Sequence, residues 1–212
     1  MTKKLILSLD ITDKQKALDI MNTVCTEIAM VKIGHYVVSS FSTIEINEIT
    51  KNLPIMLDLK FFDIPNTVLN AIKNYEEKLP NIRYFTFNGS MDSKTIQEIA
   101  NKKEGAEGVA VLVLSSECIN ESEFINKAKY NYNLGIKSFI CPPAYIKLLR
   151  NELKDDSVKL FSPSVRSKND SKNDHSKTYT SKESIQMGAS YVIVGRPIIN
   201  ATNIKEKIKE YL

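Results

Sequence analysis

Short apolar runs alternate with longer amphipathic stretches from one end of the chain to the other. Leu5–Leu9 is the first apolar run, and Thr12–Val24 follows it with apolar side chains spaced as on one face of a helix. Thr12 and Asp13 are residue types that cap the first turn of such a helix. The same alternation predicts seven further strand and helix pairs: Met30–Ile33 and Ile44–Thr50, Pro54–Leu59 and Thr67–Leu79, Arg83–Phe87 and Ser93–Lys102, Gly108–Leu114 and Glu121–Tyr132, Ser138–Cys141 and Ala144–Leu153, Val158–Ser162 and Ser181–Met187, Tyr191–Val194 and Ile204–Leu212.

The predicted strands are apolar along their whole length, as a parallel sheet buried on both faces requires. Eight strand and helix units in uninterrupted order favour closure into a barrel over an open sheet. No GxGxxG follows the first strand, which argues against a dinucleotide-binding fold. The sequence therefore predicts a single (β/α)8 TIM barrel over residues 1–212, with brief loops because such barrels usually have roughly 250 residues.

Composition and charge exclude several classes of protein. The chain is 42% hydrophobic and has a net charge of +4, with basic residues spread along it and not interleaved with aromatic ones. This pattern is not typical of a nucleic-acid-binding protein, and a small anionic substrate suits the charge as well. No apolar run approaches the 18 or so residues of a membrane span, and no signal pattern opens the chain, so we expect a soluble, cytoplasmic protein without a membrane partner. The three cysteines lack metal-ligand spacing and are expected to be buried or half-buried thiols.

The segment 164–179 interrupts the alternation of strands and helices. It reads SVRSKNDSKNDHSKTY, and Val165 is its only aliphatic residue, so it cannot build a core of its own. One interpretation is a disordered insertion at a loop tip. The other is a mobile lid over 163–179, because the segment follows the seventh strand and barrel sites lie where strands end.

The strongest local signal for chemistry is LDLKFFDIPNT, Leu57 to Thr67. Side chains alternate along a strand, so Asp58 and Lys60 point to one side and the two leucines to the other. If the leucines face the helices, both charges project into the barrel, where burial is costly unless they pair. A structural salt bridge is the simple interpretation, but it explains poorly why Asp63 also lies in this short stretch.

Charged residues mark the first two strand ends as well. Asp10 follows the first apolar run and Lys32 lies in MVKIG, so Asp10, Lys32, Asp58 and Lys60 are predicted to form an array of alternating sign at one mouth of the barrel. Opposite charges about 4 Å apart interact by roughly 4 kcal/mol at an effective dielectric of 20, which fixes orientation and protonation. A lysine held between carboxylates suits a general acid that delivers a proton.

The stretch VIVGRPI, Val192 to Ile198, is a candidate phosphate site. Barrels often bind phosphate with the loops after strands seven and eight, and Gly195 and Arg196 follow the eighth predicted strand. A guanidinium binds phosphate through paired hydrogen bonds. The simple alternative is a surface arginine beside a turn glycine, but the basic residues of the preceding segment favour phosphate; these are Arg166, Lys168, Lys172 and Lys177.

Taken together, DLKFFDIPNT, Lys32, Asp10 and VGRPI resemble the orotidine 5′-phosphate decarboxylase family, in the family's order and across the whole chain. The resemblance implies decarboxylation of orotidine 5′-monophosphate to uridine 5′-monophosphate, the last step of de novo pyrimidine synthesis, without metal or organic cofactor. It implies that Lys60 protonates C6 of the pyrimidine. Lys32, Asp58 and Asp63 would complete the catalytic network.

The resemblance also implies how the substrate is bound. Asp10 and Lys32 would contact ribose hydroxyls, Ser115 would read the pyrimidine edge, and Gly195 and Arg196 would hold the phosphate. The family's aspartate that matches Asp63 reaches into the partner's site, which implies a homodimer. The other substrate-binding residues implied are Ile64 and Thr67, again reaching the partner's site, and Pro163 and His175 of the lid.

Three stretches depart from the family pattern. Pro163-Ser164-Val165-Arg166 stands where PGIR is usual, so serine replaces glycine. Asn173-Asp174-His175 stands where GDQ is typical, so His175 takes the place of the glutamine that bridges base and phosphate. The fourth predicted strand ends in FTFNGS and lacks the usual histidine and paired glycines.

Two other functions are compatible with a phosphate-binding barrel. A sibling sugar-phosphate decarboxylase or hexulose-phosphate synthase shares DxK but uses a metal and typically carries glutamate where this chain has Lys32. A catalytically silent phosphate-binding barrel is the second. Lys32 and Ile64–Thr67 argue against the sibling, and the retention of Asp58, Lys60 and Asp63 argues against the silent barrel.

Overall fold

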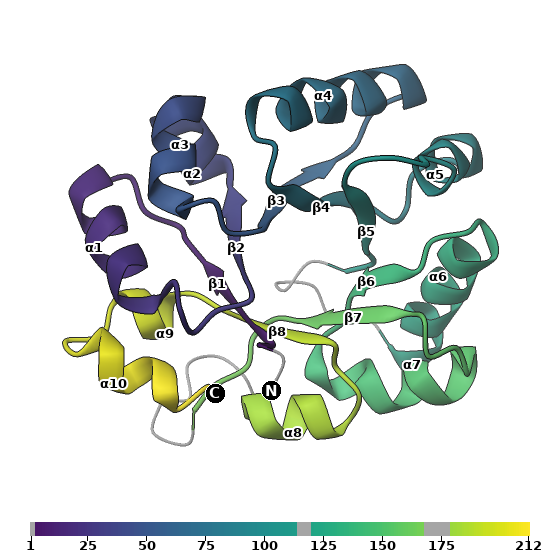
Figure 1. Cartoon of the computed structure of the whole chain (residues 1–212). Coiled ribbons are helices and arrows are strands. Elements are labelled where there is room, and N and C mark those ends of the chain that lie inside the picture. The colour runs from purple at the N-terminus through teal and green to yellow at the C-terminus, as the bar shows by residue number, and fades with distance from the viewer. Residues whose placement is uncertain (1–2, 114–119, 168–178) are drawn as a thin grey trace.

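The computed structural model describes residues 3–113, 120–167 and 179–212. Eight parallel strands form a closed barrel in sequential order, and β1 pairs with both β2 and β8. Seen in Figure 1, the strands form an inner ring and the helices lie around its outside. The predicted (β/α)8 barrel is therefore confirmed.

The strands are β1 (Leu5–Ser8), β2 (Met30–Gly34), β3 (Ile55–Phe61), β4 (Ile82–Asn88), β5 (Glu107–Val111), β6 (Ser138–Ile140), β7 (Lys159–Ser162) and β8 (Tyr191–Val194). The helices are α1 (Lys14–Val24), α2 (His35–Ser40), α3 (Thr43–Thr50), α4 (Pro65–Lys78), α5 (Ser93–Ala100), α6 (Glu121–Asn133), the 3-10 turn η1 (Pro143–Tyr145), α7 (Ile146–Leu153), α8 (Ser181–Gln186), α9 (Arg196–Ile199) and α10 (Ile204–Lys209).

Side-chain caps explain where several of these helices begin. Asp13 caps α1 as predicted, since its Oδ1 accepts a hydrogen bond from the Lys16 amide at 3.0 Å. Pro65 occupies the first turn of α4, where its missing N–H costs nothing. The two short helices α2 and α9 are not predicted by the sequence pattern, and neither has a side-chain cap.

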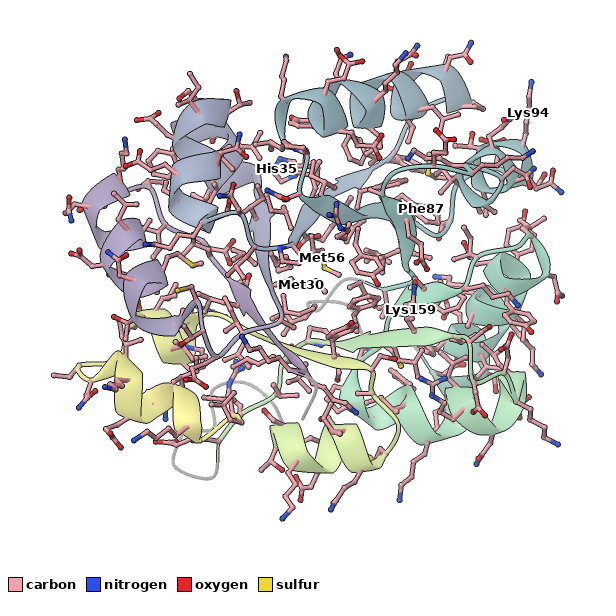
Figure 2. All side chains as sticks on the ribbon, in the orientation of Figure 1. Met30, His35, Met56, Phe87, Lys94 and Lys159 are labelled. Atoms are coloured by element: carbon pink, nitrogen blue, oxygen red, sulfur yellow. The ribbon has the colours of Figure 1, made fainter. Side chains whose placement is uncertain are left out.

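The protein has two apolar cores, one outside and one inside the barrel wall. Residues of odd position on β1, such as Leu5 and Leu7, pack outward against the helices, and Ile6 packs inward. Figure 2 places Met30 and Met56 inside the ring of strands. The inner core consists of Ile6, Met30, Met56, Val109, Phe161 and Ile193, with Tyr84, Ile140 and Tyr191 packed against it. Because strand side chains alternate, the residues two positions further along each strand line the mouth of the barrel.

The remaining whole-chain predictions concern the cysteines and membrane-spanning segments. Cys141 is buried, which raises the pKa of its thiol, and Cys25 is half-buried, as expected. Cys118 lies outside the described residues. Among the helices that the structure describes, none has both the length and the apolar character needed to cross a membrane.

Candidate active site

An ion-pair network occupies the mouth of the barrel. Lys32 and Asp58 lie two residues beyond Met30 and Met56, and they meet with Lys32 Nζ 2.5 Å from Asp58 Oδ2. The second carboxylate oxygen, Oδ1, accepts a hydrogen bond from Lys60 Nζ at 2.9 Å. The side chains of Lys32 and Asp58 are 13% and 12% exposed, and that of Lys60 is 41% exposed. The predicted pairing of these three residues is present, with Lys60 nearest to solvent.

A β-bulge places Lys60 at this position. Leu57 pairs with Phe85 and Phe61 pairs with Phe87, so β3 advances four residues while β4 advances two. Within this irregular stretch Lys60 has a φ of 49°, in the left-handed region that is uncommon for residues other than glycine. Such a conformation costs on the order of 1–3 kcal/mol and tends to occur at functional sites. The backbone is therefore strained at the residue that the sequence marks as the chemical centre.

Thr86 supports both ends of the Asp58–Lys60 pair. This fully buried β4 residue donates a hydrogen bond from Oγ1 to Asp58 Oδ1 at 2.8 Å and accepts one from the Lys60 amide at 3.0 Å. The hydroxyl thus fixes the carboxylate and satisfies the backbone of the bulge. Sequence reasoning missed Thr86, because a threonine inside FTF reads as an ordinary β-branched strand residue.

The variant Thr86→Val is expected to lower the free energy of unfolding by about 1–3 kcal/mol, because it leaves the Lys60 amide and one carboxylate oxygen without their partner. Urea unfolding measures this difference. The matched control is Thr86→Ser, which keeps the hydroxyl and should retain most of the stability. Equal stability of the valine variant and the wild type would contradict the role of the hydroxyl.

The ammonium groups determine the charge state of Asp58. Burial raises the pKa of this carboxyl, but attraction to Lys32 and Lys60 and the hydrogen bonds they donate outweigh burial and lower its pKa to about 2. Asp58 is therefore ionised throughout the neutral range. A fixed negative charge between two cations is the electrostatic core of the site.

This shift predicts a pH dependence of stability. The pKa of Asp58 is lower in the folded than in the unfolded chain, so its ionised form stabilises the fold above pH about 4. This contribution to the free energy of unfolding is about 2 kcal/mol, and it is lost as the pH falls from about 4 to about 2. Urea unfolding of wild type and Asp58→Asn across this range provides the measurement. The advantage of wild type should shrink below pH about 4. Parallel pH profiles for the two proteins would contradict the assigned ion pairs.

Asp10 lies on the same rim but outside this network. Its Oδ2 accepts a hydrogen bond from Ser8 Oγ at 2.9 Å. A Cβ added to Gly34 would lie 3.9 Å from Asp10 Oδ1 and 3.3 Å from the Asp58 carbonyl oxygen, so this glycine keeps the rim open between the two aspartates. Among the described residues, no ion pair joins Asp10 to Lys32 or Lys60. The predicted four-residue array is thus a three-residue network with Asp10 close by.

Asp63, Ile64 and Thr67 lie just beyond β3 and are exposed. The Ile64 amide donates to Asp63 Oδ1 at 2.7 Å, and the following Pro65 begins α4. Ile64 is 65% exposed and its neighbour Phe62 is 68% exposed, which is unusual for such large apolar side chains. None of the hydrogen bonds or ion pairs that the structure describes brings Asp63 to Lys60 within this chain.

The ends of β7 and β8 carry the candidate phosphate residues. Gly195 packs so closely on β1 that an added Cβ would lie 3.0 Å from both the Cβ and the carbonyl oxygen of Ser8. Arg196 is exposed and begins α9, and Pro163 is half-buried after β7. The Arg166 amide donates to the Tyr179 carbonyl at 2.9 Å, which joins the two ends of the predicted lid. Ser115, His175 and most of the lid (168–178) lie outside the described residues.

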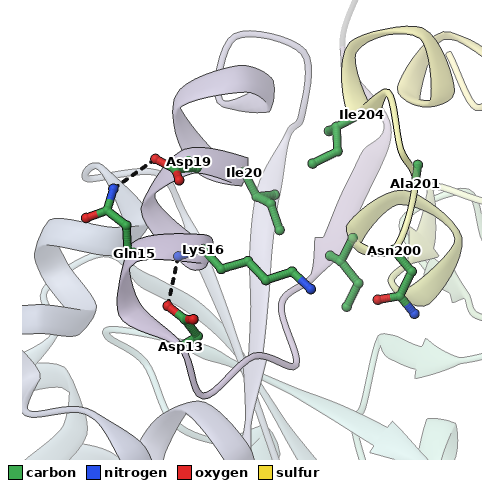
Figure 3. A pocket seen from close by; sticks show the side chains of 9 residues that line it. Asp13, Gln15, Lys16, Asp19, Ile20, Asn200, Ala201 and Ile204 are labelled. Carbon is green, nitrogen blue, oxygen red and sulfur yellow. Dashed lines mark hydrogen bonds between the residues drawn. The ribbon is translucent and has the colours of Figure 1, made fainter.

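A further cavity lined by described residues lies away from this mouth. It has a volume of about 430 Å³ and lies on the outside of the barrel between α1 and the α9–α10 region. As Figure 3 shows, Lys16, Ile20, Asn200 and Ile204 line it. It contains no member of the Lys32–Asp58–Lys60 network, so the chemistry is assigned to the mouth. Within the described residues, no group of three metal-ligating side chains gathers anywhere.

Comparison with known families identifies the protein family to which this barrel belongs. The sequence profile described as "Orotidine 5'-phosphate decarboxylase / HUMPS family" matches residues 3–211. This chain belongs to that family. The match covers the whole barrel, including every described residue of the candidate site.

Relatives of this family share most of their length with the chain. It is 30% identical to "Orotidine 5'-phosphate decarboxylase" of Wolbachia pipientis subsp. Culex pipiens, with 94% of this chain and 92% of the relative covered. It is 28% identical to the protein of the same name from Carboxydothermus hydrogenoformans, with 100% and 95% covered. The crystal structure of orotidine 5'-phosphate decarboxylase from Lactobacillus acidophilus superposes with a TM-score of 0.78 at 23% identity and 99% coverage of both chains, which supports the fold.

The structure describes two of the three stretches in which the chain departs from the usual family pattern. Ser164, which stands where the family typically has glycine, has a φ of 61°. The backbone thus keeps the left-handed conformation that glycine adopts most readily. Asn88 ends β4 where the family commonly has histidine, and its Oδ1 accepts a hydrogen bond from the Ser90 amide at 2.9 Å. The turn after β4 is therefore closed by a side-chain amide.

Proposed function

We propose that this protein decarboxylates orotidine 5′-monophosphate to uridine 5′-monophosphate and carbon dioxide, with Lys60 protonating C6 and without a cofactor. The observation that carries the proposal is the Lys32–Asp58–Lys60 network at the mouth of the barrel. Membership of the family and the shared name of the relatives support this reaction.

The chemical step uses few groups. The bond between C6 and the carboxylate breaks, its electron pair stays on C6, and carbon dioxide leaves. The Lys60 ammonium then donates its proton to C6, and the resulting amine regains a proton from water. Asp58 lies beside the departing carboxylate and holds Lys60 in place through the 2.9 Å contact. Preorganised charges of this kind need no reorientation during the reaction.

The remaining rim residues bind the substrate in this proposal. Asp10 and Lys32 contact the ribose hydroxyls, and Ser115 reads the pyrimidine edge. Gly195 and Arg196 hold the phosphate, where the exposed guanidinium offers paired donors. Segment 163–179 acts as a lid that grips the phosphate, with Pro163 at its start and His175 in place of the usual glutamine. The contact between Arg166 and Tyr179 supports this role, because it holds the two ends of the segment together.

A homodimer completes the site in this proposal. Asp63, Ile64 and Thr67 reach into the partner's site, and Asp63 joins the partner's catalytic network. Their exposure and the neighbouring exposed ring of Phe62 support the proposal, since apolar side chains at that level of exposure are typical of a surface that another chain covers. The closed barrel leaves these residues on its rim, where a second copy has access to them.

The direct test is turnover of orotidine 5′-monophosphate by metal-free protein in EDTA, followed through the loss of the orotate chromophore. We expect steady decarboxylation that added magnesium does not increase. No turnover in EDTA, together with magnesium-dependent conversion of a ketose phosphate, would assign the protein to the sibling activity. Tight nucleotide binding without turnover under either condition would instead indicate a silent barrel.

A further inference from the structure

Thr86 lies beside the ion pairs in the barrel interior but is shielded from solvent. Tyr84 packs against the inner core, and Thr86 follows two residues later on β4, so its side chain also faces the interior. Lys32 and Asp58 stand in the same relation to the inner core on β2 and β3. Thr86 is fully buried, whereas the Lys60 side chain is 41% exposed. A substrate at the mouth can therefore contact Lys60, and Thr86 can affect a reaction only through the residues that it touches.

The Thr86 hydroxyl restricts the Asp58 carboxylate. It donates its single proton to Oδ1 at 2.8 Å, and Lys60 Nζ donates to the same oxygen at 2.9 Å. The other oxygen, Oδ2, is paired with Lys32. Because each carboxylate oxygen has its own partners, rotation of the carboxylate would break all three contacts. Thr86 thus helps to determine which oxygen faces Lys60.

The same hydroxyl supports the backbone of Lys60. Regular pairing of β3 with β4 is interrupted between Leu57 and Phe61, and Lys60 has a φ of 49° within this interruption. Its amide donates to Thr86 Oγ1 at 3.0 Å, which gives the amide a partner at that point. A left-handed backbone persists at a residue other than glycine only when its surroundings hold it. Thr86 is part of that support, so it acts on the direction in which the Lys60 side chain leaves the strand.

We propose that Thr86 is a positioning residue for the chemical step, whose hydroxyl sets the place of the Lys60 ammonium through the Asp58 carboxylate and the Lys60 backbone. This inference rests on the proposed function, in which Lys60 is the proton donor. Proton transfer requires the donor within hydrogen-bond reach of its acceptor, and displacement of a reacting group by about 1 Å can lower a rate by about a hundredfold. The proposed substrate-binding residues do not include Thr86, so its hydroxyl acts on turnover and leaves affinity unchanged.

The experiment compares Thr86→Val with Thr95→Val, a matched control. Thr95 is also fully buried, and its hydroxyl donates to a carboxylate oxygen of Asp92. It lies on α5, which belongs to the outer ring of helices in Figure 1. Both substitutions remove a buried hydroxyl and keep a branched side chain, so a general effect on packing or stability is common to them. Thr86→Ser tests rescue by a second hydroxyl.

For each protein, urea unfolding first establishes that the variant is folded under the assay conditions. The values of kcat and KM are then measured with orotidine 5′-monophosphate, and the inhibition constant is measured with uridine 5′-monophosphate. Thr86→Val is also combined with Lys60→Ala in one chain, which tests whether the hydroxyl acts through Lys60. If the valine variant does not fold, Thr86→Cys replaces it, because a thiol is a much weaker donor than a hydroxyl.

We expect Thr86→Val to lower kcat by between about tenfold and a hundredfold, while KM and the inhibition constant change by less than about threefold. Thr86→Ser and Thr95→Val should each retain kcat within about threefold of the wild type. In the chain that carries Lys60→Ala, removal of the Thr86 hydroxyl should lower kcat by less than about threefold further, since the group that it positions is absent.

Wild-type kcat in folded Thr86→Val would overturn the proposal, because the hydroxyl would then serve stability alone. An equal loss of kcat in Thr86→Ser or Thr95→Val would also overturn it, and so would a loss of affinity for both nucleotides as large as the loss of kcat. A further loss in the Lys60→Ala chain as large as that in the wild-type chain would show that the hydroxyl does not act through Lys60. Absence of turnover in the wild type would instead overturn the proposed function.

Discussion

Replacing Lys60 with alanine is expected to lower kcat by roughly 10⁴-fold, the upper range of what a positioned general acid contributes. Lys60 carries the ammonium closest to solvent in the network, and Lys32 is already paired with the other oxygen of Asp58. No other cation of the Asp58 network is therefore in position to take over protonation. Binding of uridine 5′-monophosphate should change by less than about tenfold, because the proposed phosphate site at Gly195 and Arg196 follows β8 and does not include Lys60. Steady-state kinetics and equilibrium titration measure the two quantities.

Lys94→Ala is the control for this substitution. Lys94 lies on α5 at the periphery of the molecule in Figure 2, so its removal changes the net charge without touching the mouth. It should leave kcat unchanged. If Lys60→Ala keeps substantial turnover, Lys60 is not the proton donor. If it loses binding as severely as turnover, its role is in holding the substrate.

The site residues that lie on regular strands were predictable, because the alternation of side chains along a strand determines which of them face the interior of the barrel. The alternation in LDLK places Asp58 on the inner side, and Leu57 is fully buried on the outer side. Lys32 lies at the equivalent level of β2, since it is two residues beyond Met30. A period of two and a closed ring of strands were therefore sufficient to bring these charges together.

The parts that the sequence did not predict depend on tertiary structure. The bulge in β3 follows from pairing with β4, and nothing in LKFFD marks the left-handed φ of Lys60. Thr86 gains its role only because that bulge turns the Lys60 amide towards its hydroxyl.

Mixing the inactive variants Lys60→Ala and Asp63→Asn is expected to restore about one quarter of wild-type activity, provided that the dimer exchanges its subunits freely. In a mixed dimer, one site combines the barrel of the Asp63→Asn chain, which retains Lys60, with the intact Asp63 of the other chain. The second site lacks both groups. Half of the dimers are mixed and half of their sites are intact, which gives the expected fraction.

Differently tagged chains, co-expressed and purified through both tags, would isolate the mixed dimers. These should show about half of wild-type activity, because one of their two sites is complete. A mixture of Lys60→Ala with Asp58→Asn is the control, since both residues belong to the same barrel. In that pair each barrel lacks one of its own groups, so no site is complete and no rescue is expected. Rescue in the control would show that Lys60 and Asp58 need not belong to the same chain. Absence of rescue in purified Lys60→Ala and Asp63→Asn dimers would show that Asp63 acts within its own chain. The exposure of Asp63 and Ile64 on the rim would then require another explanation.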